Sequence, residues 1–463
     1  MKLSGISLWL LAASIVHAGK SQFEAFENEF YFKDHLGTIS VYHEPYFNGP
    51  TTSFPESCAI KQVHLLQRHG SRNPTGDDTA TDVSSAQYID IFQNKLLNGS
   101  IPVNFSYPEN PLYFVKHWTP VIKAENADQL SSSGRIELFD LGRQVFERYY
   151  ELFDTDVYDI NTAAQERVVD SAEWFSYGMF GDDMQNKTNF IVLPEDDSAG
   201  ANSLAMYYSC PVYEDNNIDE NTTEAAHTSW RNVFLKPIAN RLNKYFDSGY
   251  NLTVSDVRSL YYICVYEIAL RDNSDFCSLF TPSEFLNFEY DSDLDYAYWG
   301  GPASEWASTL GGAYVNNLAN NLRKGVNNAS DRKVFLAFTH DSQIIPVEAA
   351  LGFFPDITPE HPLPTDKNIF TYSLKTSSFV PFAGNLITEL FLCSDNKYYV
   401  RHLVNQQVYP LTDCGYGPSG ASDGLCELSA YLNSSVRVNS TSNGIANFNS
   451  QCQAHSTNVT VYY

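Results

Sequence analysis

The amino-acid sequence predicts an α/β fold: a large α/β domain with a mostly parallel central sheet flanked by helices, plus an inserted, smaller all-α subdomain. Apolar runs of strand length at residues 63–66, 157–160 and 334–338 are each followed by polar residues and then by a helical pattern. This alternation is typical of βα units and a parallel sheet. From residue 195 to 298 the pattern becomes helical and polar instead, which indicates the inserted subdomain.

The composition is that of an acidic globular protein. Its 463 residues correspond to one large or two ordinary domains, and a hydrophobic content of 43% is ample for a core. The formal net charge of -26 argues against nucleic acid as a partner, because nucleic acid requires a basic surface. A protein that works at acid pH would lose much of this charge by protonation.

Residues 1–18 have the pattern of a secretory signal peptide. Lys2 provides a positive start, residues 6–16 an apolar segment, and residues 16–18 a cleavage site. A membrane anchor needs about 20 apolar residues, and no run in the chain is that long. We therefore expect a secreted protein, extracellular, periplasmic or cell-wall associated, without a membrane partner. Asn-x-Ser/Thr sequons predict a glycosylated surface at Asn98, Asn104, Asn186, Asn221, Asn251, Asn328, Asn433, Asn439 and Asn458.

The eight cysteines indicate disulfide bonds, because their number is even and the chain carries an export signal. The sequence has no Cys-x-x-Cys pair and no histidine-rich cluster with zinc spacing, so we expect no metal. The residues alone leave the connectivity open. The cysteines are Cys58, Cys210, Cys264, Cys277, Cys393, Cys414, Cys426 and Cys452.

Local signals predict the remaining elements. In the inserted subdomain, Pro237 interrupts a helical pattern over residues 230–246. Thr253 has the spacing of a helix cap, and Thr281 is a cap followed by a proline at the first helical position. We also expect helices at 84–97, 131–153 and 303–323, a strand at 190–193, and a β-hairpin formed by 386–393 and 398–404.

The most informative stretch follows the first apolar run and reads Gln67-Arg68-His69-Gly70-Ser71-Arg72-Asn73-Pro74-Thr75. Arginines offer planar, permanently charged donors that suit phosphate oxygens. A histidine held between Arg68 and Arg72 can act as a nucleophile toward phosphorus. We expect Gly70 to let the backbone approach an anion closely.

Two further strand-to-helix junctions carry candidate site residues. Arg167 lies where a helix opens after the second apolar run, and a helix N-terminus presents backbone donors and a positive dipole end. His340 and Asp341 follow the third apolar run, directly before another helix. Sites in open α/β sheets form at the carboxyl ends of strands, so we expect the three junctions to meet.

Together these stretches resemble the histidine acid phosphatases, in the branch of fungal phytases and yeast secreted acid phosphatases. The resemblance rests on Arg-His-Gly-x-Arg-x-Pro after a strand, on Arg-Val-x-x-Ser-Ala from Arg167, and on the His340-Asp341 pair. It covers most of the chain from Cys58 to the hairpin, including the cysteine spacing. It implies the disulfides Cys58–Cys393, Cys210–Cys452, Cys264–Cys277 and Cys414–Cys426.

The resemblance also implies the roles of the site residues. His69 would attack phosphorus and form a phosphohistidine, and Asp341 would protonate the leaving alkoxide and then help water to attack. Arg68, Arg72, Arg167 and His340 would bind the phosphoryl oxygens, with no metal and no cofactor.

An acid-active enzyme of this kind needs a neutral His69 and a protonated Asp341. Nearby guanidinium charges should lower the pKa of His69. The negative charge of a bound phosphate should raise the pKa of Asp341.

The implied function is a secreted acid phosphomonoesterase that releases orthophosphate from a small-molecule phosphomonoester, with phytate as the favoured substrate. Residues 76–79 are acidic, where some fungal phytases carry lysines, and this favours the alternative of broad specificity with little phytate preference. A phosphohistidine mutase or transferase fits an exported glycoprotein poorly. A non-catalytic cell-wall glycoprotein is the alternative from a different class, and the presence of all six site residues argues against it.

Residues 19–57 form an aromatic N-terminal arm without a period of 2 or 3.6. Its rings must be buried, either on its own domain or across a subunit boundary. We predict the second arrangement, a homo-oligomer formed through the arm, and expect the catalytic site to assemble without residues 19–50. The predicted organisation is therefore 1–18 signal peptide, 19–57 arm, 58–75, 150–195 and 300–463 catalytic α/β domain, and 76–149 and 196–299 helical subdomain.

Overall fold

The computed structural model describes residues 30–45, 47, 49–196, 200–214, 218–327, 331–442, 444–456 and 459–462. The predicted signal peptide and the first part of the arm lie outside the described residues. No helix of the described chain is long and apolar enough to cross a membrane.

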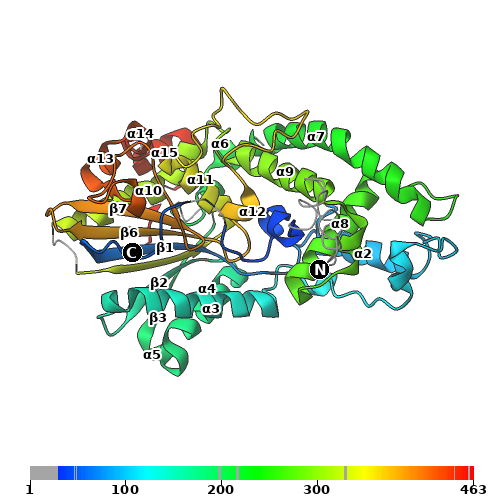
Figure 1. Ribbon diagram of the computed structural model, residues 1–463, viewed down its shortest axis with the longest axis horizontal. Coiled ribbons are helices and arrows are strands. Elements are labelled where there is room, and N and C mark those ends of the chain that lie inside the picture. Colours follow the sequence, from blue (N-terminus) through cyan, green and yellow to red (C-terminus); the bar gives the residue numbers. More distant parts are fainter. Residues whose placement is uncertain are drawn as a thin grey trace, which may run out of the picture.

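The centre of the described chain is an eight-stranded sheet in the order β3-β2-β5-β1-β6-β7-β8, with β9 paired to β7 (Figure 1). Strands β3, β2, β5 and β1 run parallel, and the strands from β6 onward are antiparallel to their neighbours. The sheet is therefore mixed and not mostly parallel as predicted, because its second half is built from hairpins. The strands are β1 (Cys58–Arg68), β2 (Tyr158–Ala163), β3 (Thr188–Leu193), β5 (Val334–Thr339), β6 (Asn385–Cys393), β7 (Tyr398–Val404), β8 (Gln407–Tyr409) and β9 (Cys426–Glu427).

Helices cover both faces of this sheet (Figure 1). On one side α3 (Ser132–Tyr149) packs against α4 (Glu166–Phe180). The two helices approach closely: a Cβ added at Gly142 would lie 2.0 Å from the Phe175 carbonyl oxygen. The opposite face is covered by α10 (Ala307–Val326), α11 (Asp341–Leu351), α13 (Leu428–Asn433), α14 (Ser435–Ser442) and α15 (Gly444–Cys452).

A second group of helices lies beyond one end of the sheet (Figure 1). It consists of α2 (Ala86–Leu97), α7 (Ile218–Leu242), α8 (Val254–Arg271) and α9 (Pro282–Trp299). The predicted cap at Thr253 is confirmed as a capping box with Asp256, and Thr281 caps α9 with Pro282 at its first position. The predicted interruption at Pro237 is wrong, because α7 continues through that residue.

These helices match the predicted subdomain in kind, and its boundaries stay a prediction. One difference is clear: α3 falls in the range 76–149 assigned to the subdomain, yet it packs on α4 beside the sheet.

The smaller elements are α5 (Met184–Lys187), α6 (Pro211–Glu214), α12 (Thr376–Phe379), β4 (Ala201–Asn202), β10 (Val459–Thr460), and the short 3₁₀ helices η1 (Phe32–His35), η2 (Gly37–Ile39), η3 (Pro111–Lys116), η4 (Ala124–Asn126), η5 (Tyr150–Leu152), η6 (Gly181–Asp183), η8 (Met206–Ser209), η9 (Asn243–Tyr245), η10 (Asp275–Leu279) and η11 (Ala421–Asp423).

The described part of the arm packs on its own chain. Phe32 stacks on Phe285 of α9 with ring centroids 5.0 Å apart, and Phe47 contacts Phe379 and Tyr409. We predicted that the rings of the arm pack across a subunit boundary, but those of Phe32 and Phe47 pack on their own chain. Oligomerisation through residues outside the described range stays a prediction.

The four disulfides implied by the resemblance are confirmed: Cys58–Cys393, Cys210–Cys452, Cys264–Cys277 and Cys414–Cys426. Such bonds persist in oxidising compartments and fit an exported protein. Among the sequon asparagines whose exposure the structure describes, Asn98, Asn186, Asn251 and Asn433 are exposed, so glycans can be accommodated there.

The burial of His64 predicts that the fold becomes less stable at acid pH. His64 on β1 is fully buried, stacks on Phe335, and has no hydrogen-bond partner on either ring nitrogen among the described residues. Burial lowers the pKa of His64 to about 3. Because the unfolded chain takes up this proton near pH 6.5, stability should fall as the pH drops from that value toward 3, by about 4 kcal/mol at pH 3.5.

We expect His64→Phe to remove this loss, so that its unfolding midpoint gains on the wild type progressively below pH 6.5. The measurement is thermal unfolding between pH 3.5 and 7. His117→Phe, at an exposed histidine, is the control and should follow the wild type. Parallel pH curves for wild type and His64→Phe would contradict the prediction.

Candidate active site

The structure brings all six predicted site residues to one edge of the sheet. Strands β1 and β5 pair in parallel with Arg68 opposite Thr339, so His69 and His340 follow at the same level. His340 is the N-cap residue of α11 and Asp341 its first residue. The other two residues are Arg72, in the loop after β1, and Arg167, the second residue of α4.

The surroundings of His69 fix its tautomer and disfavour its charged form. It is buried, its backbone N–H donates to the Thr339 carbonyl at 3.2 Å, and its Nδ1 lies 3.0 Å from the Gly70 carbonyl oxygen. Because a carbonyl only accepts, Nδ1 carries the proton and Nε2 carries the lone pair. Burial and then the charges of Arg68, Arg167 and Arg72 hold the pKa of His69 well below its ordinary value.

Arg68 is fixed on three sides and makes an ion pair with Asp341. Its Nη1 donates to the carbonyl oxygens of Thr38 at 2.5 Å and Val380 at 2.6 Å, and its Nη2 lies 2.7 Å from Asp341 Oδ2. Thr38 belongs to the arm. Deletion of residues 19–50 would remove one acceptor of Arg68, and the expectation that the site assembles without them stays a prediction.

Asp341 is the partner of Arg68 in this ion pair. Tyr296 donates a hydrogen bond of 2.6 Å to its Oδ2. Burial raises the pKa of Asp341, but the Arg68 charge and the Tyr296 hydrogen bond outweigh it and leave the pKa below its ordinary value. The Arg68 ion pair and the Tyr296 hydrogen bond thus favour the carboxylate form of Asp341.

The arginines of the site have more donors than the protein has acceptors. Arg72 donates to the Asn73 carbonyl at 2.9 Å, and Arg167 pairs with Asp128 at 3.0 Å. The Nε atoms of Arg68, Arg72 and Arg167 are buried and have no hydrogen-bond partner among the described residues. A surplus of buried cationic donors favours binding of an anion with several oxygens. No group of three or more metal-ligating side chains occurs within the described chain.

Several side chains that position this loop were missed in the sequence. Glu137 of α3 accepts hydrogen bonds from the backbone N–H of Ser71 at 2.8 Å and from its hydroxyl at 2.7 Å. Ser171 accepts from the Gly70 N–H at 3.1 Å. Ser171 lies in the Arg-Val-x-x-Ser-Ala stretch and was detectable there, whereas nothing in the sequence marks Glu137.

Gly70 lies against α3, and its expected role in the approach of an anion stays a prediction. A Cβ at this position would lie 2.5 Å from the Gly134 carbonyl oxygen of α3. The glycine therefore permits close packing of the loop on α3, which in turn brings Glu137 within reach of Ser71.

His340 contacts a further residue that sequence reasoning missed. Its Nε2 lies 3.3 Å from Oε2 and 3.4 Å from Oε1 of Glu195, which follows β3. The rings of His340 and His69 are 5.8 Å apart. A fourth strand end thus contributes to the site.

A cavity of about 320 Å³ extends from the arginines to the helices α7, α8 and α9. At the far end, His227 of α7 lies between Asp291 at 2.8 Å and Asp295 at 3.3 Å. Burial lowers the pKa of His227, but the two carboxylates outweigh it and raise the pKa to about 9. Arg231 also pairs with Asp291 at 2.9 Å. The part of the cavity that would receive a leaving group therefore carries two cations balanced by two carboxylates.

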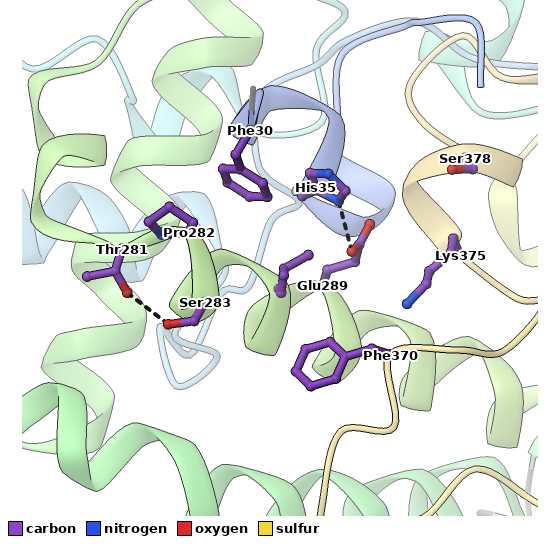
Figure 2. A pocket seen from close by; sticks show the side chains of 10 residues that line it. Phe30, His35, Thr281, Pro282, Ser283, Glu289, Phe370, Lys375 and Ser378 are labelled. Carbon is purple, nitrogen blue, oxygen red and sulfur yellow. Dashed lines mark hydrogen bonds and ion pairs between the residues drawn. The ribbon is translucent and has the colours of Figure 1, made fainter. Parts of the chain in front are cut away.

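A second, larger cavity has a volume of about 670 Å³ and is lined by Phe30, Leu286 and Phe370 among others. Figure 2 shows Phe30 and Phe370 at this cavity. None of the six predicted site residues lines it. Its polar wall includes Glu289 of α9, whose Oε2 lies 3.0 Å from His35 Nδ1 (Figure 2). Helix α9 thus contributes side chains to both cavities.

The sequence model of the histidine phosphatase superfamily (branch 2) matches residues 59–405, a range that includes all six predicted site residues. The chain belongs to this superfamily.

Known relatives of this histidine phosphatase share most of its length. It is 74% identical over 463 residues to a thiamine-repressible acid phosphatase of Schizosaccharomyces pombe, covering 100% of both chains. It is 58% identical over 454 residues to an acid phosphatase of the same organism, covering 98% of each. Among solved structures, the phytase from D. castellii is similar, with a TM-score of 0.79, 25% identity, and coverage of 93% of this chain and 90% of that one. The chain is accordingly a phosphoric monoester hydrolase of the histidine acid phosphatase type.

Glu137 offers a test of how the loop after β1 is held. We expect Glu137→Ala to lower both kcat/KM and stability, the latter by about 1–3 kcal/mol, because the Ser71 N–H loses its partner. Thermal unfolding and assays on p-nitrophenyl phosphate would measure the two effects. Glu147→Ala, on the same helix but in an exposed pair with Arg143, is the control and should change little. Equal effects of the two substitutions would show that Glu137 does not position the loop.

Proposed function

We propose that the chain is a secreted acid phosphomonoesterase that releases orthophosphate through a phosphohistidine at His69. The observation that carries this proposal is the buried His69 ring, whose Nδ1–H is committed to Gly70 and whose Nε2 lone pair is free among four cationic groups. A mutase or transferase would use the same intermediate. Export favours hydrolysis, because water is the acceptor available outside the cell.

The first step transfers the phosphoryl group to the enzyme. Arg68, Arg72, Arg167 and His340 bind the phosphoryl oxygens and stabilise the charge that spreads over them. The Nε2 lone pair of His69 attacks phosphorus, forming an N–P bond as the ester P–O bond breaks. The departing alkoxide oxygen takes a proton from Asp341.

The second step returns the enzyme to its starting state. The Asp341 carboxylate accepts a proton from a water molecule, and the water oxygen attacks phosphorus. The N–P bond breaks, orthophosphate leaves, and the electron pair returns to Nε2 of His69.

Substrate binding supplies the proton on Asp341. In the free protein Arg68 pairs with Asp341 and lowers its pKa. A bound phosphoryl group competes for Arg68 and adds negative charge nearby, and both effects raise the pKa of the carboxyl group. An acidic medium favours the same protonated form.

The cavity favours small phosphomonoesters as substrates, because its leaving-group end has no excess of positive charge. Phytate is the second candidate, supported by the similarity to the D. castellii phytase. Asp77, in the acidic stretch, accepts hydrogen bonds within its own loop and does not line the cavity. Its influence on phytate is therefore long-range. The ratio of kcat/KM for phytate to that for p-nitrophenyl phosphate, measured from pH 3 to 6, decides between the two candidates.

The nucleophile assignment predicts that His69→Ala abolishes turnover while folding and secretion remain intact. Acid-quenched wild-type protein incubated with a ³²P-labelled substrate should carry the label on His69, as peptide mapping would show. Label on another residue, or full activity of His69→Ala, would refute the assignment.

The general-acid assignment predicts that Asp341→Asn slows hydrolysis by about 10²- to 10⁴-fold, because the alkoxide departs without a proton. The loss should be smaller for p-nitrophenyl phosphate than for an alkyl phosphate, since nitrophenolate leaves readily without protonation. An equal loss on both esters would mean that Asp341 is not the acid.

A further inference from the structure

Glu195 contacts the phosphate-binding site from a strand end that carries none of the predicted residues. It follows β3, two residues beyond Leu193. Both of its carboxylate oxygens lie within 3.4 Å of His340 Nε2, and only 9% of its side chain and 3% of that of His340 are exposed. Two largely buried, ionisable groups therefore face each other at the edge of the site.

Glu195 is held in place independently of His340. The backbone N–H of Gln165 donates to its Oε1 at 3.0 Å, and the Gln165 side chain donates to its Oε2 at 3.1 Å. Gln165 is the N-cap residue of α4, the helix that carries Arg167, and its amide also donates to Tyr208. The carboxylate is thus anchored to the same element as a phosphate-binding arginine.

The contact determines what the second nitrogen of His340 can do. The Nε2 nitrogen of His340 contacts the Glu195 carboxylate. The Nδ1 nitrogen has no hydrogen-bond partner among the described residues. In a neutral ring with the proton on Nε2, Nδ1 carries a lone pair and repels phosphoryl oxygens. Only the imidazolium form donates from both nitrogens, to Glu195 and to the substrate.

We propose that Glu195 is a positioning residue that keeps His340 in the imidazolium form, so that Nδ1–H donates to the phosphoryl group. The proposal rests on the function proposed above, in which His340 binds the phosphoryl oxygens. Under this proposal, loss of the His340 proton sets the upper pH limit of phosphate binding, and Glu195 moves that limit to higher pH.

The other charged groups around His340 show why a counter-ion is needed. Burial lowers the pKa of His340 and Arg167 of α4 lowers it further, while Glu195 and Asp341 of α11 raise it. The pKa lies below its ordinary value, so the imidazolium form depends on these carboxylates. His69 of β1 also faces the ring. The Asp341 charge is shared with Arg68 and disappears when Asp341 is protonated as an acid. Glu195 is then the carboxylate left to balance His340 against Arg167.

Asp128 provides a matched comparison on the same side of the site. It pairs with Arg167 at 3.0 Å and also accepts a hydrogen bond from the Gly76 N–H. Like Glu195 it holds a phosphate-binding cation, but an arginine keeps its charge at every working pH. Loss of Asp128 can therefore change affinity without creating a new dependence on pH.

The experiment compares full-length wild type, Glu195→Gln and Asp128→Asn on p-nitrophenyl phosphate from pH 3.5 to 7.5. For each variant, kcat/KM is divided by the wild-type value at the same pH, which cancels the ionisation of the substrate. We expect the ratio for Glu195→Gln to fall with rising pH by about tenfold, the factor for a decrease of one unit in the pKa of His340. The ratio for Asp128→Asn should stay constant. Glu195→Asp, which keeps the charge, should lie between wild type and Glu195→Gln.

Each outcome decides one question. A ratio for Glu195→Gln that does not change with pH would overturn the proposal, since a purely structural role would act equally at all pH values. The same fall in Asp128→Asn would also overturn it. If Glu195→Gln does not fold, the Glu195→Asp ratio decides in the same way. Inactivity of the wild type on p-nitrophenyl phosphate would instead refute the proposed function.

Discussion

The parallel pairing of β1 with β5 is the constraint on which the rest of the site depends. Arg68 lies opposite Thr339, and a histidine directly follows each of these strand ends. The register therefore places the rings of His69 and His340 next to each other. A register shift of one residue would turn the side chains to the opposite face of the sheet. The neighbouring pairing of β2 with β5 then brings the helix with Arg167 to the same edge.

Much of the fold could be predicted from sequence because the signals are local. Apolar runs located β1, β2 and β5, and the spacing of Thr253 and Asp256 located the start of α8. The six site residues could be named because each lies at the end of a strand or the start of a helix, where sequence position determines spatial position. Their roles came from the family resemblance, and the four disulfides came from it as well.

The parts that could not be predicted depend on contacts between distant residues. Glu137 contacts Ser71 across 66 positions and Glu195 contacts His340 across 145, and neither acid differs in sequence from an ordinary surface carboxylate. The packing of the arm on α9 and the use of Gly70 against α3 are likewise decided by surfaces that form only on folding. The number of antiparallel strands in the sheet was underestimated, because the sequence of the β6–β7 hairpin does not reveal that β6 pairs with β1.

Carboxylates accompany the cations of the site: Asp341 at Arg68, Asp128 at Arg167 and Glu195 at His340. An anion that binds these cations must therefore displace carboxylates of the protein itself. This arrangement reconciles an anion site with a chain of net charge -26, because the cations stay compensated until a stronger anion displaces the protein's own.

The hydrogen bond from Arg68 to the Thr38 carbonyl has a consequence for the maturation of the chain. A peptide carbonyl that belongs to the N-terminal arm accepts a hydrogen bond from an arginine beside His69. Removal of the predicted leader at residue 18 leaves that carbonyl in place, whereas a protease that trims past residue 38 would take it away. The arm thus links the integrity of the N-terminus to the chemistry at the strand ends, and recombinant forms that begin after Thr38 would lack a part of the active site.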